Sequence, residues 1–472
     1  MSARMLGVAV LAALAAAGCG GDGGGTARDA VADDAARMDV PAGDEATGTD
    51  ADRDLAAQET GGDATSDAAG EDPAAGDEAD GEAADAATDP VADPAAEDAT
   101  EDADTNPCPR LPGAADRARV VAVSFPYLEG ARKSGDWALL QLAADGTLSG
   151  PGPRFQMGPA FDGEVAFTPD GEIGIAVQDD GTLGVFRVAG DGTAQVVHAA
   201  FAGHFYASRI VMSAAGDHAF VLDTEWRDSG GSTRRGGGVY RVDIGCDGTL
   251  TDRGMAMPAK LPAALLAVPG QPGRAVLAAR DVLDVMSGGD LHLLSSEDAP
   301  TVVHSAAALS EDSSVDGSAM TPDGKFALLG DSGMFSTQGV GVVEVAGDTL
   351  VPRQFLSGIG NPAAIVVSPS GGTALVAGAY EPDDLWILDR DDAHPEAPFS
   401  IRGTVEYAGG GSQLPTSMVM LERGPLAGRV LVTEVTGIRQ IDLATDGSVV
   451  DHGVFPLGGG VTNMPAVIGV QP

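Results

Sequence analysis

The chain has 472 residues, of which 67 are glycine and 4% are aromatic, and its formal net charge is −43 at pH 7. An average globular domain has neither this excess of acid nor so few aromatic residues, so part of the chain is not a packed domain. The charge also argues against nucleic acid as a partner, because contacts to phosphate require clustered Lys and Arg.

Residues 1–18 predict an export signal, because one Arg precedes an apolar run that is too short to span a bilayer as a mature helix. The AAGC sequence at residues 16–19 resembles the lipobox of bacterial lipoproteins, in which small residues precede a lipidated Cys. The resemblance implies lipidation of Cys19, and Gly20 behind it implies sorting to the outer membrane of a Gram-negative cell. The alternative is an ordinary secretory signal with an incidental Cys. We expect an outer-membrane-anchored lipoprotein of the cell envelope, facing the periplasm or the cell surface.

Residues 19–106 begin with this Cys and predict a disordered acidic linker. Between Gly20 and Asn106 there are 27 Asp or Glu and three Arg in a background of Ala, Gly, Thr and Pro. Such a segment buries too little apolar surface to offset its chain entropy. A flexible coil of this length spans roughly 50 Å, so it would tether the rest of the chain near a membrane without pressing it onto the surface.

Residues 107–472 predict a β domain built on a repeated turn. Thr-Pro-Asp-Gly occurs in FTPDGEIGIA at 167–176 and again in MTPDGKFALL at 320–329. Weaker copies recur about every 50 residues, a period typical of a propeller blade. These copies are residues 212–221, 268–277, 367–376 and 421–432. Because Pro presets the turn and Gly supplies positive φ, the phrase predicts the turn between the two innermost strands of each blade.

A second repeated phrase predicts the outer hairpin of each blade. Asp-Gly between alternating apolar runs is a strong hairpin signal. It occurs in residues 143–149, 189–195, 245–251 and 444–450, with a related sequence at 346–352.

The two ends of the domain predict how the ring closes. Residues 463–472 resemble an inner strand that stops where its turn would begin, and residues 118–125 resemble a second strand without an inner strand before it. The predicted fold is therefore all-β: a seven-bladed β-propeller closed by pairing of the C-terminal strand with the N-terminal blade, preceded by the acidic tether.

The repeats resemble those of the YVTN and lactonase-type seven-bladed propellers, and VYRVDIGCDGTLT at 239–251 is the most similar single copy. The resemblance implies the fold, but such propellers include binding proteins, scaffolds and enzymes. No catalytic motif can be transferred, since the chain has no phosphate-binding Gly loop, Gly-x-Ser-x-Gly elbow or haem Cys pair.

Cys108 and Cys246 are the two cysteines of the predicted propeller, and export permits a disulfide. In an up-and-down blade the first and third turns lie on one face, and the second loops and the links between blades lie on the other. Cys246 belongs to a third turn, and Cys108 stands about ten residues before the first predicted strand, a reach of about 33 Å. We expect a Cys108–Cys246 disulfide, the alternative being two free or buried thiols. The tether would then leave from this face, and the opposite face would look away from the membrane.

The opposite face carries loops of uneven length, and we interpret it as the binding face. These loops contain residue types that are enriched at interface hot spots. The candidates are Tyr127, Trp226, Arg227, Arg234, Arg235, Phe335 and Tyr380. The alternative for each is packing against its own neighbours.

The links that enter the inner strands predict a ring of polar groups at the channel mouth, the default ligand site of a propeller. The candidates are Asp162, Glu164, His204, Arg209, Asn361, Gln413 and Asn463. The Asp and Asn oxygens suit calcium, but the chain has no Asp-x-Asp-x-Asp-Gly loop and no paired His motif. We therefore predict no cofactor or metal, the alternative being a calcium ion at this mouth.

These features favour a binding or scaffolding module for a protein or an envelope component, and we expect a monomer. The alternative is a lactonase-like hydrolase at the channel mouth. In that case Glu164, His204 and Arg209 are the catalytic candidates that would polarise or hydrate a ring ester.

Overall fold

The computed structural model describes part of the chain, beginning at Cys108. The described residues are 108–472 except 115, 129–130, 225–236, 260, 272, 280–290, 296–299, 310–314, 334–336, 379–384, 406, 408–414, 416 and 458–463. The predicted signal, Cys19 and the predicted tether lie outside them. Within these ranges there is no helix with the length and apolar character that a membrane span needs.

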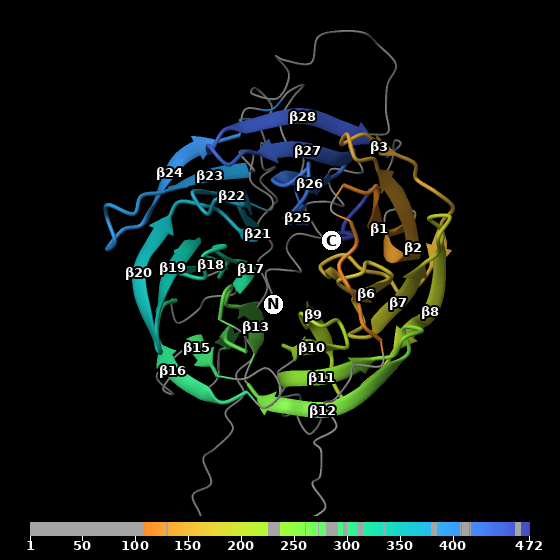
Figure 1. Cartoon of the computed structure of the whole chain (residues 1–472), viewed down its shortest axis with the longest axis horizontal. Coiled ribbons are helices and arrows are strands. Elements are labelled where there is room, and N and C mark those ends of the chain that lie inside the picture. Colours follow the sequence, from red (N-terminus) through yellow and green to blue (C-terminus); the bar gives the residue numbers. More distant parts are fainter. Residues whose placement is uncertain are drawn as a thin grey trace, which may run out of the picture. The chain divides into compact units, whose positions relative to one another are not determined.

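The described residues form seven antiparallel sheets, which Figure 1 shows as blades around a central channel. Blade 1 contains β29 (Ile468–Val470), β1 (Arg119–Leu128), β2 (Ala131–Leu142), β3 (Leu148–Ser149) and β4 (Phe155–Gln156). Blade 2 contains β5 (Val165–Phe167), β6 (Ile173–Val177), β7 (Leu183–Val188) and β8 (Ala194–Phe201). Blade 3 contains β9 (Ala207–Met212), β10 (His218–Asp223), β11 (Gly238–Ile244) and β12 (Leu250–Pro258).

The remaining four blades repeat this order from the channel outward. Blade 4 contains β13 (Pro262–Ala267), β14 (Ala275–Ala279), β15 (Leu291–Leu294) and β16 (Val302–Ala306). Blade 5 contains β17 (Val315–Met320), β18 (Phe326–Asp331), β19 (Gly339–Ala346) and β20 (Thr349–Ser357). Blade 6 contains β21 (Pro362–Val367), β22 (Thr373–Gly378), β23 (Leu385–Arg390) and β24 (Phe399–Thr404). Blade 7 contains β25 (Met418–Met420), β26 (Arg429–Glu434), β27 (Gly437–Leu443) and β28 (Val449–Pro456).

The C-terminal strand closes the ring, as the sequence predicted. β29 lies antiparallel to β1, with Val121 opposite Val470 and Val123 opposite Ile468. Blade 1 therefore takes its inner strand from the end of the chain and its other strands from the beginning, so that the first and last blades become neighbours without an open edge. The predicted seven-bladed propeller is confirmed.

The Thr-Pro-Asp-Gly phrase forms the turn between the first two strands, because its side chains satisfy the turn's own backbone. The Thr168 hydroxyl accepts a hydrogen bond from the N–H of the residue five positions on (3.1 Å). The Asp170 carboxylate accepts one from the N–H two positions on (2.9 Å). Gly171 has φ +75°, where a side chain would be strained. Residues 321–326 repeat these bonds in blade 5.

The Asp-Gly phrase forms the predicted outer hairpin by the same local mechanism. In blade 1 the Asp145 carboxylate accepts the Thr147 N–H (2.9 Å), and Gly146 has φ +87°. An aspartate that bonds the backbone two residues on holds the turn without any tertiary contact.

The outer strand of blade 1 differs from the single strand that the repeat predicted. It is broken into β3 and β4, which pair with different parts of β2. Pro151 and Pro153 stand between the two pieces, and proline has no N–H to donate to a ladder.

Arginine side chains join neighbouring blades at these hairpins. Arg274 of blade 4 donates to the Gly347 carbonyl of blade 5 (2.7 Å), and Arg402 of blade 6 donates to the Gly447 carbonyl of blade 7 (2.8 Å). Arg429 of blade 7 donates to the Gly146 carbonyl of blade 1 (3.3 Å). The apolar core lies between the sheets, as in the cluster shared by blades 2 and 3 around Ile175 and Val221.

Candidate functional site

A polar cavity of about 320 Å³ lies in the channel and is lined by residues from all seven blades. Its lining residues belong to the innermost strand of each blade or stand within three residues before it, apart from Leu222 of β10. Its charged and hydroxyl-bearing lining residues are Asp162, Glu164, Arg209, Asp316, Ser318 and Ser417. Of the residues predicted at the channel mouth, Asp162, Glu164 and Arg209 line this cavity.

Arg209 ties three blades together across this cavity. It belongs to β9 of blade 3, and its Nη1 donates to the backbone carbonyls of Asp162 (3.1 Å) and Ser208 (3.2 Å). Its Nη2 donates to the carbonyl of Asp316 in blade 5 (3.2 Å). Three of its five N–H donors are thus used on backbone oxygens of blades 2, 3 and 5.

Glu164 lies beside this arginine and also forms a hydrogen bond with the backbone. Its Oε1 accepts a hydrogen bond from the Ile210 N–H of the neighbouring blade. Burial raises the pKa of the Glu164 carboxyl, and the charge of Arg209 and the hydrogen bond from Ile210 oppose that rise without cancelling it. The group therefore keeps its proton to a higher pH than an exposed glutamate.

His204 does not lie at the channel, so that prediction was wrong. Its side chain is 85% exposed, and its Nδ1 lies 2.8 Å from Oδ2 of Asp252 on β12, the outer strand of blade 3. The link from β8 to β9 must cross from the outer edge of one blade to the inner edge of the next. His204 is in the first part of that link and Arg209 is beyond its end, which is why five residues separate an exposed histidine from a channel arginine.

Asn361, another predicted mouth residue, is paired with a loop side chain of blade 5. Its N–H donates to Gln338 Oε1 (3.0 Å), and Gln338 Nε2 donates back to Asn361 Oδ1 (3.2 Å). From blade 6 the cavity is lined by Ala363, Ala364 and Ile365 of β21, and Asn361 is not among its lining residues. Gln413 and Asn463 lie outside the described residues.

Tyr127 was predicted on the exposed binding face, but its ring is buried. It is 6% exposed and packs edge-on against Phe161, with ring centroids 5.5 Å apart. Its role is therefore packing between blades 1 and 2. The other predicted contacts of this face lie outside the described residues and stay predictions: Trp226, Arg227, Arg234, Arg235, Phe335 and Tyr380.

Asp316, Ser318 and Ser417 belong to the cavity but were not singled out from the sequence. A signal for Asp316 was present. Asp-Gly precedes the Thr-Pro-Asp-Gly turn at 162–163 and, one residue closer to the turn, at 316–317, so comparing the two repeats would have pointed to Asp316.

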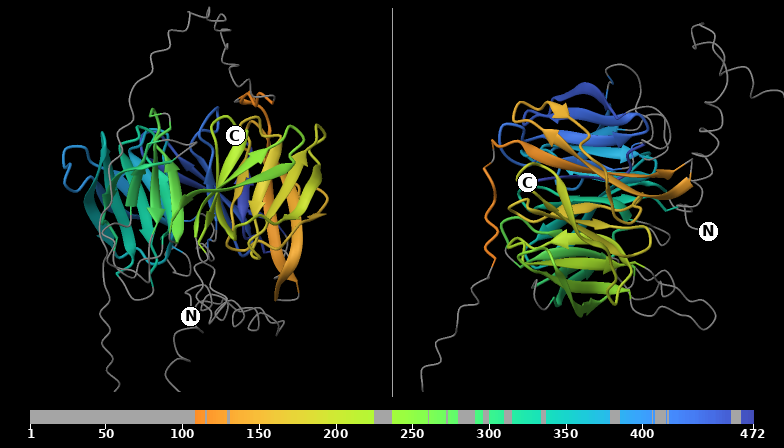
Figure 2. Two further views of the ribbon diagram at one scale, coloured as in Figure 1. Left: turned by 90° about the horizontal axis from the view of Figure 1, so that it is seen from below. Right: turned by 90° about the vertical axis from the view of Figure 1, so that its right-hand side faces the viewer.

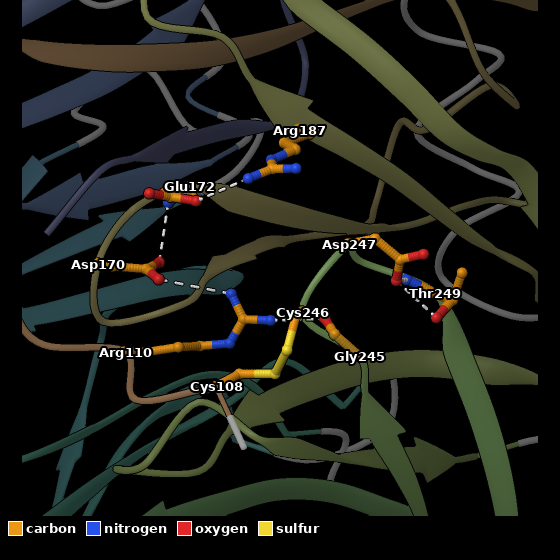
Figure 3. The surroundings of a disulfide bond; sticks show 9 residues. All are labelled: Cys108, Arg110, Asp170, Glu172, Arg187, Gly245, Cys246, Asp247 and Thr249. Carbon is orange, nitrogen blue, oxygen red and sulfur yellow. Dashed lines mark hydrogen bonds and ion pairs between the residues drawn. A yellow bond between two sulfur atoms is a disulfide. The ribbon is translucent and has the colours of Figure 1, made fainter. Parts of the chain in front are cut away.

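Cys108 and Cys246 are joined by a disulfide, the pairing that the sequence analysis expected, with Cα atoms 5.4 Å apart. Figure 3 shows Arg110 beside it, pointing at the carboxylate of Asp170 in blade 2 and toward the hairpin of blade 3. In the side views the orange segment before β1 runs along one face of the ring, and the β1–β2 hairpin projects from the other (Figure 2).

In the part of the chain that the structure describes, no three His, Cys, Asp or Glu side chains converge in a way that could hold a metal ion. The prediction that the protein needs no cofactor is untested and stays a prediction.

No protein-family model and no curated protein matches the chain. Solved structures do. A putative 6-phosphogluconolactonase from Bacteroides fragilis superposes with a TM-score of 0.54 at 13% identity, covering 76% of this chain and 99% of that one. The periplasmic gluconolactonase of Pseudomonas aeruginosa superposes with a TM-score of 0.52 at 16% identity, covering 75% and 99%.

This chain has the propeller fold of those lactonase structures. A putative 6-phosphogluconolactonase from Bacteroides uniformis gives a TM-score of 0.53 at 15% identity, covering 75% of this chain and 99% of that one. At such identities the likeness concerns the fold, because one propeller architecture carries many unrelated functions.

Proposed function

We propose that this protein is an outer-membrane lipoprotein of the bacterial cell envelope whose propeller is a binding or scaffolding platform. The lipobox at residues 16–19 and the acidic stretch behind it support an anchored, tethered domain. The platform would engage a protein or an envelope component through the face that carries the long loops.

The observation that carries the proposal is that the charged side chains at the channel form hydrogen bonds to the protein's own backbone. Arg209 donates to backbone carbonyls of three blades, and Glu164 accepts a backbone N–H across a blade interface. His204, the third catalytic candidate, is bonded to Asp252 at the outer edge. An acid or base of a hydrolase must reach the substrate's reacting atoms, and these three side chains do not converge. Arg209 and Glu164 instead join neighbouring blades at the channel, which favours a rigid platform.

A lactonase-like hydrolase at the channel is the second candidate. The raised pKa of Glu164 favours it, because a carboxyl that titrates nearer to neutral pH serves as a general acid or base. The cavity beside it measures about 320 Å³, within the size range of small-molecule sites. Three solved structures of this fold are named as a gluconolactonase or as putative 6-phosphogluconolactonases.

The first experiment uses the full chain in cells of a Gram-negative host. A photo-cross-linking amino acid is placed at Tyr380 or Arg235, on the proposed binding face, and at Asp145 or Asp191 on the disulfide face as matched controls. We expect one discrete adduct from the first pair and none from the second, in the membrane fraction of the wild type. With Cys19→Ser the protein should leave that fraction.

Turnover of lactones by purified wild type and Glu164→Gln separates the two candidates. The platform predicts no hydrolysis above the uncatalysed rate and an unchanged adduct in the variant. Hydrolysis that falls about a hundredfold in Glu164→Gln would overturn the platform in favour of the hydrolase. Identical adducts from both faces would contradict the assignment of the binding face.

A further inference from the structure

Residues 108–114 and 116–118, which we call the strap, run from blade 3 past blade 2 to blade 1 before the first strand begins. The strap starts at Cys108, bonded to Cys246 in the β11–β12 hairpin of blade 3. It ends where β1 of blade 1 begins, at Arg119. Blade 2 lies between these two points, and the strap is attached to it on the way.

Arg110 fixes the strap to blades 2 and 3. Its guanidinium donates from Nη2 to the Gly245 carbonyl of blade 3 (2.7 Å) and lies 3.5 Å from the Asp170 carboxylate of blade 2. The residue is 6% exposed, and its chain packs over Gly216, where a Cβ would come within 2.9 Å of Arg110 Cδ. Removal of this buried arginine would leave a carboxylate and a carbonyl without their partner, so its loss should weaken the attachment of the strap.

The strap meets the C-terminus at the first turn of blade 2. Arg117 Nη2 donates to the Asp170 carbonyl (2.9 Å). Gln471, directly after β29, donates to the Gly171 carbonyl (2.6 Å) and accepts the Val120 N–H (2.8 Å). The first turn of blade 2 therefore accepts hydrogen bonds from a side chain of the strap and from one directly after the last strand.

Blade 1 needs such a device because it has no covalent first turn. In blades 2 to 7 a short turn joins the inner strand to the second strand. In blade 1 the inner strand β29 is the last strand of the chain and the second strand β1 is the first, so no turn joins them. Their ladder has three residue pairs, from Val121–Val470 to Val123–Ile468. Backbone bonds from Gln471 N–H to the Val120 carbonyl (2.9 Å) and from Ser124 N–H to the Val467 carbonyl (3.1 Å) extend it. No turn joins the two strands, however, and a ladder between chain ends opens more easily than one that a turn closes.

We propose that the strap is the lock of the ring closure: the disulfide and Arg110 hold β1 against blades 2 and 3 and thereby keep β29 paired. The strap takes the place of the missing first turn. The chain therefore enters the propeller through a segment attached to three blades rather than at the end of one strand. This inference does not depend on the proposed function.

Hydrogen exchange of the oxidised full chain, read by mass spectrometry, tests the lock. In Cys246→Ser we expect protection at residues 121–123 and 468–470 to fall by about tenfold or more, beyond any loss in β18 of blade 5. Arg110→Ala keeps the disulfide and should show the same local loss to a smaller extent. This second variant also covers the case in which Cys246→Ser does not fold.

Arg274→Ala is the matched control, because it removes an inter-blade arginine of the same kind between blades 4 and 5. It should leave the protection of β1 and β29 unchanged. The proposal is overturned if the loss in both strap variants is confined to residues 108–118, or if it is equal in all seven blades. A uniform loss would mean that the disulfide acts only on the unfolded chain.

Discussion

Glu164 differs from the aspartates of the turns in the sign of its pKa shift. The Thr147 backbone and hydroxyl lower the pKa of Asp145, and the Ser448 hydroxyl and backbone lower that of Asp446. At Glu164 burial dominates and raises the pKa despite the nearby Arg209. The turns thus favour charged carboxylates, whereas the channel wall disfavours one. A group of this kind opposes folding once it ionises.

The substitution Glu164→Gln should flatten part of the dependence of stability on pH. Because the folded pKa lies above the unfolded value of 4.5, this group stabilises the fold fully below that value. The stabilisation is lost as pH rises through the folded pKa. Gln can still accept the Ile210 N–H but does not ionise. We expect the melting temperature of the variant, relative to wild type, to be higher at pH 8 than at about pH 4, by a few degrees. A difference that does not change with pH would contradict the burial of this carboxyl.

At the scale of the element, the first turns require glycine for two separable reasons. One is the backbone: Gly270 and Gly324 have φ +74° and +67°. The other is packing against the next blade. A Cβ on Gly324 would lie 2.5 Å from the Pro269 carbonyl oxygen, whereas a Cβ on Gly270 would meet nothing within 4 Å. Successive first turns therefore contact one another around the ring at some blades and not at others.

Alanine at these two positions should separate strain from packing. Gly270→Ala introduces only the left-handed backbone strain, so we expect a loss of about 1 kcal/mol in the free energy of unfolding. Gly324→Ala adds a clash with a backbone oxygen that cannot move alone, and we expect a loss at least about 1 kcal/mol larger. Urea unfolding of the two variants measures the difference. Equal losses would show that the turns of blades 4 and 5 do not press on each other.

At the scale of the whole molecule, the ring has no open edge because its two ends share a blade. β29 contributes its apolar face to the core between blades 7 and 1, where Ile468 packs with Val121 and Leu431. Gly469 lets it approach blade 2, since a Cβ there would lie 2.5 Å from Val165 Cβ. The C-terminal strand is thus at once an edge cover and a part of two interfaces.

Deletion of residues 464–472 should convert the protein into larger species. The deletion uncovers the backbone of β1, and an unpaired edge pairs with another chain. Size-exclusion chromatography with light scattering would report added dimers or aggregates at micromolar concentration. Deletion of Pro472 alone, which leaves β29 intact, is the control and should elute as the wild type does. A fully folded product of the longer deletion with the wild-type mass per particle would contradict this account of closure.

Much of the fold could be predicted from the sequence because its determinants are local and repeated. The side chains of Asp145 and Thr168 accept hydrogen bonds from backbone N–H groups no more than five residues away. The phrase therefore predicts a turn wherever it occurs in the sequence. The spacing of the phrases then gives the number of blades. The inner strand left over at the C-terminal end and the missing inner strand at the N-terminal end predict that these two ends form one blade. The same period placed Arg209 and Glu164 on links that enter the inner strands; Arg209 lies in β9 and Glu164 directly precedes β5. The period also placed Cys108 and Cys246 on one face.

Only the tertiary structure decided what those side chains do. His204 and Arg209 are five residues apart, yet one lies at the outer edge and the other in the channel, because a link between blades crosses the whole sheet. Tyr127 is buried because Phe161 of the next blade covers it. Asp316 lines the same cavity as Arg209 although the two residues are 107 positions apart in the sequence. Sequence alone determined the repeat and the closed ring. No local pattern predicts the hydrogen bonds of Arg209 to three blades. The same is true of the meeting of the strap and the C-terminus at blade 2, because both depend on contacts between residues far apart in the sequence.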